Sequence, residues 1–175
     1  MRQLAVLSAS VALLAACGSQ PPAPEQNPSG VESRSPNALA TPVTPAGAFD
    51  PMSIAALKDP RSPLSKRSVY FDLDSYVIKP EFQALMAVHA KFLSANPQMK
   101  MLIQGNADER GSREYNLALG QKRSDAVKKA LSLQGVVEAQ LESVSLGEEK
   151  PVCAEQAEEC WTQNRRGDML YSGEF

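Results

Sequence analysis

Proline is distributed unevenly along this chain, and its distribution limits where a folded domain can lie. Ten of the 13 prolines fall between Pro21 and Pro63. Proline has a fixed φ and no backbone N–H, so a segment this rich in it is poorly suited to the helices and strands of a core. The segment is also rich in small and polar residues and has no apolar periodicity. We expect a disordered linker over residues 17–66 and one folded domain over residues 67–175.

The first residues predict export. Arg2 precedes an almost wholly apolar run, Leu4 to Ala16, which has the length of a secretory signal and is too short to span a bilayer stably. The run ends in Leu-Ala-Ala-Cys, which resembles the lipobox of bacterial lipoproteins and implies a signal peptide over residues 1–16 and lipidation, with palmitate among the acyl chains, at Cys17. An ordinary signal with an incidental cysteine is the alternative. By resemblance to lipoprotein sorting rules, Gly18 favours the outer membrane, with the domain facing the periplasm.

Charge and cysteine content narrow the function classes. The 18 basic and 20 acidic residues nearly balance, so nothing indicates nucleic-acid binding. In an oxidising periplasm we expect Cys153 and Cys160 to form a disulfide, with free thiols or a metal site as alternatives. A metal site is the weakest of these, because the only histidine, His89, is distant in sequence. We expect no metal and no cofactor.

The remaining sequence alternates strand and helix patterns in the order β-α-β-α-β-(α)-β. This predicts an α+β domain with helices packed on a mixed four-stranded sheet. His89 lies within the apolar stripe of the first helix, where we expect a buried or half-buried side chain with one hydrogen bond, and a role in a partner surface is the alternative. The expected strands are 68–72, 100–104, 141–146 and 168–171, and the expected helices are 80–95, 112–134 and, more briefly, 154–164.

Arg123 is the only charged residue at the centre of the apolar stripe of the second long helix. A guanidinium buried there without a partner would cost several kcal/mol, so we expect an anionic partner. Asp108 is the candidate, because it follows the second strand and precedes this helix, where ligands often bind in α/β sheets. Two interpretations stay open, a ligand groove between Asp108 and Arg123 or a structural ion pair that orders the turn.

The segment Gly105 to Val127 resembles the signature of OmpA-like peptidoglycan-binding domains. Its Ala-Asp-Glu-Arg-Gly and Glu-Tyr-Asn strings resemble most closely one branch of that family, the peptidoglycan-associated lipoproteins. The strings Val-Tyr-Phe-Asp at 69–72, Gly-Glu-Glu-Lys-Pro at 147–151 and Asn-Arg-Arg at 164–166 also match. The resemblance extends over about residues 69–171. Asn106 stands where many OmpA-like domains have histidine, and the acidic Cys153–Cys160 loop differs from the usual sequence of the family at that point.

The resemblance implies a ligand, the meso-diaminopimelate of the peptidoglycan peptide stem. This amino acid carries an ammonium and a carboxylate at the end of its side chain. Asp108 would accept the ammonium, and Arg123 would clamp the carboxylate through two hydrogen bonds. Alanine at either position is expected to abolish binding and leave the fold intact. By motif position, the same groove would also be lined by Phe71, Asp72, Arg110, Asn116 and Leu119. Arg165 and Arg166 stay undecided between this groove and pairing with acidic surface residues.

The resemblance also implies a non-enzymatic tether between outer membrane and cell wall. The expected partners are peptidoglycan, outer-membrane lipid, the periplasmic protein TolB and other proteins of the Tol system, which supports outer-membrane integrity and constriction at cell division. The alternative is an OmpA-like wall-anchoring lipoprotein outside the Tol system. An enzyme acting on the wall is disfavoured, because one histidine cannot hold the zinc of an amidase.

Overall fold

The computed structural model describes residues 50–175, and within them helices and strands follow the expected order. The expected signal peptide, Cys17 and residues 17–49 of the expected linker lie outside the described residues. The strands are β1 (Ser68–Tyr70), β2 (Met101–Asn106), β3 (Leu141–Gly147) and β4 (Arg166–Tyr171). The α-helices are α1 (Gln83–Ala95), α2 (Arg113–Leu133) and α3 (Glu158–Asn164). Short 3-10 helices η1 (Ile54–Leu57), η2 (Pro63–Ser65), η3 (Pro80–Phe82) and η4 (Glu138–Gln140) complete the set.

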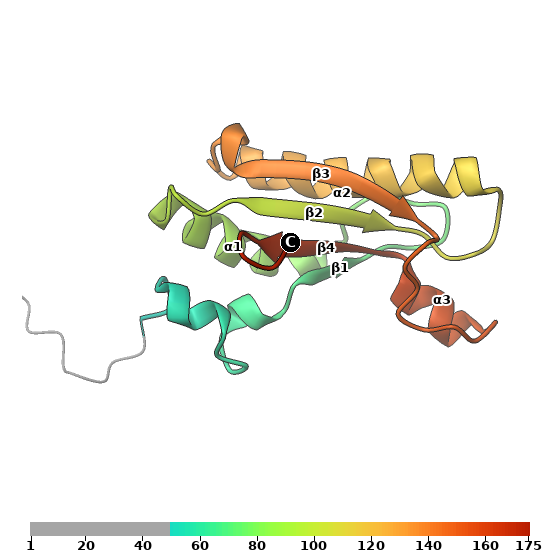
Figure 1. Ribbon diagram of the computed structural model, residues 1–175, viewed down its shortest axis with the longest axis horizontal. Helices are drawn as coiled ribbons and strands as arrows, with labels where there is room; N and C mark the ends of the chain where they lie inside the picture. The colour runs from blue at the N-terminus through green and yellow to red at the C-terminus, as the bar shows by residue number, and fades with distance from the viewer. Residues whose placement is uncertain (1–49) are drawn as a thin grey trace, which may run out of the picture. The chain divides into compact units, whose positions relative to one another are not determined.

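The sheet is mixed and has the strand order β1-β4-β2-β3 (Figure 1). β2 and β3 are parallel and are connected through α2, whereas β4 runs antiparallel to both of its neighbours, β1 and β2. The last strand of the chain therefore lies in the interior of the sheet. This topology brings the carboxyl ends of β1, β2 and β3 to the same edge as the amino end of β4.

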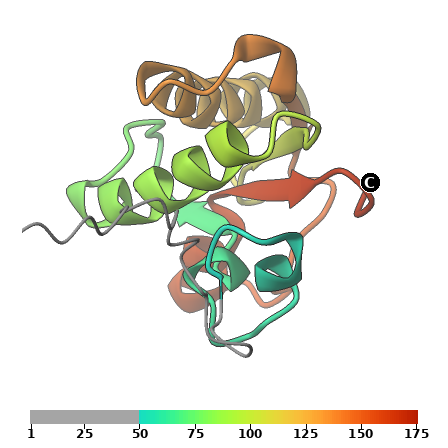
Figure 2. The same ribbon diagram turned by 90° about the vertical axis from the view of Figure 1, so that its left-hand side faces the viewer.

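Helices α1 and α2 cover one face of the sheet (Figure 2). The core lies between this face and the helices. Tyr171 of β4 is fully buried there, and its ring meets that of Phe92 from α1 edge-on at a centroid distance of 5.1 Å. His89 is also fully buried, as expected, and is held by the Tyr171 hydroxyl at 2.7 Å and by the Lys66 carbonyl at 2.8 Å.

The folded domain begins earlier than the sequence predicts. Residues 54–65 were assigned to the linker, but η1 and η2 pack onto the domain, and Ala56 and Leu64 are fully buried in its core. Arg67 fixes this segment by donating to the carbonyls of Leu57, at 3.0 Å, and Leu64, at 2.8 Å. The prediction of a linker up to residue 66 was therefore wrong for this stretch, because proline is compatible with the first turn of a short helix.

The ends of α2 follow the local signals in the sequence. Ser112 is the N-cap residue, and its hydroxyl accepts a hydrogen bond from the Tyr115 amide at 3.2 Å. At the other end Gly135 has a φ of +94°, and the amide of Val136 bonds back to the Leu131 carbonyl at 3.2 Å. This pattern is the usual glycine-terminated helix end.

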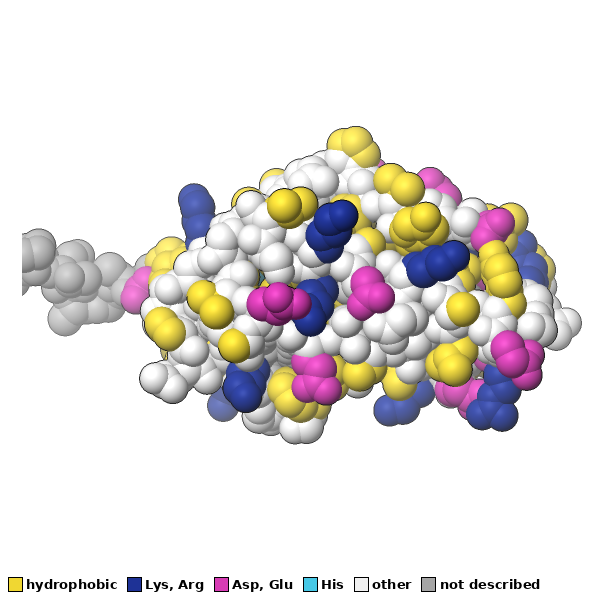
Figure 3. All heavy atoms as spheres, turned by 90° about the horizontal axis from the view of Figure 1, so that it is seen from above, with side chains coloured by type: hydrophobic (Ala, Val, Ile, Leu, Met, Phe, Trp, Pro, Cys, Tyr) yellow, Lys and Arg dark blue, Asp and Glu magenta, His cyan; other side chains and the backbone are white. Residues whose placement is uncertain are grey.

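The surface seen along α2 and β3 mixes both signs of charge, with basic and acidic side chains interspersed (Figure 3). Such a mixture agrees with the balanced charge of the chain and gives this face no strong net field. Within residues 50–175, none of the helices is both long and apolar enough to cross a membrane.

Candidate functional site

A cavity of about 250 Å³ opens where the ends of β1 and β2 meet the start of β4. Its walls come from three segments that are distant in sequence: the loop after β1, the turn between β2 and α2 with the first turns of α2, and the residue before β4. The lining residues are Leu73, Asp74, Asp108, Arg110, Tyr115, Asn116, Leu119, Arg123 and Arg165. Five of the seven predicted groove residues therefore line one cavity.

Asp108 is buried in the turn after β2, with 4% of its surface exposed, and two arginines surround its carboxylate. Oδ1 accepts from the Arg110 amide at 3.1 Å and from its Nε at 3.3 Å. Oδ2 accepts from Arg110 Nη2 at 2.7 Å and from Arg165 Nη1 at 3.2 Å. Burial acts to raise the pKa of Asp108, but the bonds from Arg110 and Arg165 outweigh it and hold the pKa below its ordinary value. The group is therefore an anion at neutral pH.

Arg123 lines the same cavity, but none of the acidic side chains among residues 50–175 forms the ion pair with it that the sequence predicts. Its side chain is fully buried and donates to three backbone carbonyls: Asp72 at 3.1 Å, Ser75 at 2.8 Å and Asn106 at 2.8 Å. Burial lowers the pKa of Arg123 to about 10, so it keeps its charge at neutral pH. A guanidinium has five N–H donors, and two are left beyond these three bonds to the described residues. Arg123 thus ties the loop after β1 to the end of β2.

Arg165, which the sequence left undecided, belongs to this site. It is 4% exposed and binds Asp108, the Phe71 carbonyl at 3.2 Å and Glu158 at 2.7 Å. The Asn-Arg-Arg string points to this residue, but the string alone does not show that the residue before β4 lies beside the end of β2. Its neighbour Arg166 pairs instead with Asp168 at 2.8 Å.

Phe71 and Asp72 do not line the cavity with their side chains, contrary to the prediction. The Phe71 ring is buried, and the Arg123 guanidinium lies over it at 5.3 Å from the ring centroid. The Asp72 carboxylate is largely exposed and pairs with Lys79 at 2.7 Å. Both residues contribute through their backbone carbonyls, which accept from Arg165 and Arg123, respectively. Their carbonyls anchor the two arginines, whereas their side chains lie outside the cavity lining.

The first turns of α2 supply the remaining predicted residues and one that was missed. Asn116 and Leu119 are both buried, and the Asn116 amide donates to the Glu148 carboxylate. Tyr115 lies at the cavity mouth, where its hydroxyl donates to Asp74 of the opposite loop. The sequence could have indicated Tyr115 as a cavity residue through its place in the Glu-Tyr-Asn string.

Asn106, at the position where many OmpA-like domains have histidine, is almost fully buried at the end of β2. Its amide nitrogen donates to the Gln104 carbonyl at 3.2 Å and to Asp168 at 3.3 Å. Its side chain thus faces β4, and only its backbone carbonyl reaches Arg123. The side chain at position 106, asparagine here instead of histidine, is not part of the cavity lining.

Close packing of α2 on β2 holds the site together. A Cβ atom on Gly105 would lie 1.8 Å from the Gly120 carbonyl oxygen, and one on Gly120 would lie 2.3 Å from Ser145 Oγ. Only glycine allows this approach. It sets the distance between the turn that carries Asp108 and the helix that carries Arg123.

A larger hollow of about 670 Å³ lies between η2, β1 and α1, with Tyr70 and Phe82 among its walls. Its charged groups are exposed or already engaged: Arg61 pairs with Asp59, and Arg67 with Glu174. The smaller cavity is the better candidate for a specific site, because one carboxylate, Asp108, and two guanidinium groups, Arg123 and Arg165, are buried at it.

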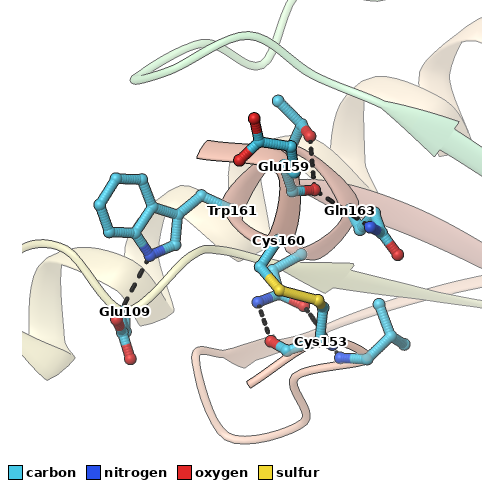
Figure 4. Close-up of a disulfide and its surroundings, with 9 residues drawn as sticks. Glu109, Cys153, Glu159, Cys160, Trp161 and Gln163 are labelled. Atoms are coloured by element: carbon cyan, nitrogen blue, oxygen red, sulfur yellow. Dashed lines mark hydrogen bonds between the residues drawn. A yellow bond between two sulfur atoms is a disulfide. The ribbon is translucent and has the colours of Figure 1, made fainter. Parts of the chain in front are cut away.

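Cys153 and Cys160 form a disulfide that joins the loop after β3 to helix α3 (Figure 4). The side chain of Asn164 adds to this link, accepting from the amide of Val152 at 2.9 Å and donating to the carbonyl of Cys153 at 2.7 Å. From the same helix, Trp161 donates through Nε1 to Glu109 at 3.3 Å. Cys160 is therefore next in sequence to a residue that contacts the turn between β2 and α2.

The model of the OmpA family matches residues 70–165, more than half of the chain, and this range includes every predicted ligand-binding residue. The chain belongs to the OmpA family. Within that family it is similar to the peptidoglycan-associated lipoprotein of Pasteurella multocida, with 47% identity over 104 residues, which are 59% of this chain and 69% of the relative. The protein of the same name from Pseudomonas aeruginosa is 44% identical over 124 residues, 71% of each chain. The resemblance seen in the sequence is thus confirmed.

Solved structures agree with the fold. The crystal structure of the peptidoglycan-associated lipoprotein from Burkholderia pseudomallei superposes with a TM-score of 0.66 and is 60% identical in sequence, covering 67% of this chain and 99% of that one. The C-terminal domain of Helicobacter pylori MotB matches with a TM-score of 0.57 at 21% identity, covering 61% of this chain and 84% of that one. At that identity it supports the fold alone.

Proposed function

We propose that this domain of the OmpA family binds peptidoglycan non-covalently, as the names of its relatives suggest, by taking the diaminopimelate of the peptide stem into the cavity at the strand ends. One observation carries the proposal: a buried carboxylate, Asp108, and a buried guanidinium, Arg123, line the same small cavity. Such a cavity complements a ligand group with both charges. The terminus of the diaminopimelate side chain is such a group.

The charges of the cavity suggest how each end of that group would be held. Asp108 would accept the ammonium, and the two N–H donors of Arg123 beyond its carbonyl bonds would face the carboxylate. Both oxygens of Asp108 already accept two hydrogen bonds each, so the ammonium must replace one donor. Arg110 is the one to move, because its side chain is 33% exposed whereas that of Arg165 is 5% exposed.

The wider role we propose is that of a tether. Lipidation at Cys17 would hold the chain in the outer membrane, and the domain would hold the wall without cutting it. In the Tol system the same domain would also bind TolB and support constriction at division. A pull-down from periplasmic extract distinguishes this role from that of a wall anchor outside the Tol system, because only the first retains TolB.

Calorimetric titration with stem peptides tests the binding proposal. We expect binding of a peptide that contains diaminopimelate and at least tenfold weaker binding of the analogue with lysine, which lacks the carboxylate. Asp108→Asn keeps the shape of the side chain but loses the charge, and it should abolish binding of the first peptide. Lys129→Gln on the exposed side of α2 is the control and should bind like the unmodified chain. Equal affinity for the two peptides would refute the ligand assignment.

A further inference from the structure

Trp161 of α3 contacts the two residues that follow Asp108 in the turn between β2 and α2, Glu109 and Arg110. Its indole Nε1 donates to the Glu109 carboxylate at 3.3 Å (Figure 4). The guanidinium of Arg110 lies over the indole ring, 4.1 Å from its centroid. A single side chain therefore holds the part of the turn that directly follows Asp108.

Glu158, one turn earlier on α3, bonds to both arginines that surround Asp108. Its Oε1 accepts from Arg165 Nη2 at 2.7 Å, and its Oε2 lies 3.4 Å from Arg110 Nη1. Each of these guanidinium groups is thus shared between Asp108 and Glu158. If a ligand ammonium takes the place of Arg110 on Asp108, Trp161 and Glu158 remain as partners for the displaced cation.

Helix α3 has seven residues, a length at which an isolated helix is unstable in water. Cys160 lies between Glu158 and Trp161 and is 3% exposed, and its disulfide to Cys153 fixes the helix to the loop after β3. The orientation of both side chains therefore depends on the disulfide. Closing a loop in this way limits the alternative conformations of the segment.

We propose that Trp161 and Glu158 are positioning residues for the diaminopimelate site, and that the Cys153–Cys160 disulfide sets ligand affinity by holding them against Arg110. The inference rests on the proposed function. It adds that the affinity of the site for its ligand depends on α3. Trp161 and Glu158 act by orienting the turn and by receiving Arg110 when the ligand displaces it. Loss of either partner makes that displacement less favourable.

The test is the dissociation constant of the full-length chain for the diaminopimelate stem peptide. Trp161→Ala removes the cation–π contact with Arg110 and should weaken binding about twofold to thirtyfold, which is about 0.5–2 kcal/mol. Glu158→Gln should have an effect of similar size, and so should Cys153→Ser combined with Cys160→Ser. Thr162→Ala is the matched control on α3, because the Thr162 hydroxyl bonds only to the Glu159 carbonyl, and it should bind normally.

Two combined variants separate positioning from a general loss of structure. In an Arg110→Gln background Trp161→Ala should have little further effect, because the cation that it holds is gone. In a background that combines Trp161→Ala with Glu158→Gln, reduction of the disulfide should change affinity by less than about twofold, because both side chains that it holds are gone. Thermal unfolding of each variant, followed in parallel, identifies any that fail to fold.

The outcomes also separate this inference from the proposed function. If Asp108→Asn abolishes binding while Trp161→Ala and Glu158→Gln bind normally, the inference is wrong and the site assignment stands. If Asp108→Asn binds like the unmodified chain, the site assignment itself is wrong. If Trp161→Ala weakens binding equally with and without Arg110, Trp161 acts through the general stability of α3, and the positioning role is refuted.

Discussion

Asp108 and Arg165 form an ion pair at 3.2 Å in which each side chain is only 5% exposed. One residue follows β2 and the other precedes β4, so the pair joins two adjacent strands at the edge where the cavity opens. Removing one member of a buried pair leaves the other charge uncompensated, which costs more than loss of an exposed pair. The pair is therefore part of both the fold and the site.

Arg165→Gln should destabilise the domain by about 3–5 kcal/mol, because the buried carboxylate of Asp108 loses the one of its two arginine partners that is itself buried. Urea unfolding followed by circular dichroism measures the change. Arg61→Gln is a suitable control, since the Arg61 side chain is 89% exposed and its replacement should cost less than about 0.5 kcal/mol. Equal midpoints for the two variants would contradict the structural role of Arg165.

Arg123→Lys should also destabilise the fold, by about 3 kcal/mol, because an ammonium cannot reach the three carbonyls that the guanidinium joins. This corrects the expectation that replacing Arg123 affects binding alone. Lys122→Ala, at the exposed neighbouring position, should change stability by less than about 0.5 kcal/mol. An Arg123→Lys variant with unchanged stability and no affinity for peptidoglycan would restore the simpler view of a ligand clamp.

Gly105→Ala should lower stability by about 3 kcal/mol, because the new methyl group meets the Gly120 carbonyl and must push α2 away from β2. Gly167→Ala serves as the comparison. A Cβ atom there would lie 3.3 Å from a Val127 methyl group, and the expected cost is about 1 kcal/mol. Differential scanning calorimetry measures the loss of stability in both variants. A larger loss for Gly167→Ala than for Gly105→Ala would show that α2 separates easily from β2.

His89 should make stability depend on pH between about 6.5 and 4. Burial lowers its pKa from 6.5 to about 4, so the unfolded chain binds a proton in this range and the folded chain does not. The contribution is complete above pH 6.5 and is lost as pH falls toward 4, by about 3 kcal/mol in total. Urea midpoints at pH 7 and 4.5 measure it. In His89→Gln the difference between the two pH values should shrink, and an unchanged difference would assign the effect to other groups.

Local patterns were sufficient to predict the order and approximate bounds of the strands and α-helices. The Ser112 cap, the glycine end of α2 and the alternation of strand and helix act over a few residues, so they can be read directly from the sequence. The buried arginine of α2 was found in the same way, from its place in the apolar stripe. The signature around Asp108 also indicated the family.

Only the tertiary structure decided which groups meet. β4 inserts between β1 and β2, which brings Arg165 to Asp108 and gives Arg123 three carbonyls instead of an acid. Residues 54–65 join the domain because Ala56 and Leu64 are buried in a core formed by residues far along the chain. Periodicity reports which face of an element is buried, whereas partners across strands depend on topology and on the distances between elements. For this reason the sequence alone could place Asp108 and Arg123 but could not determine their partners.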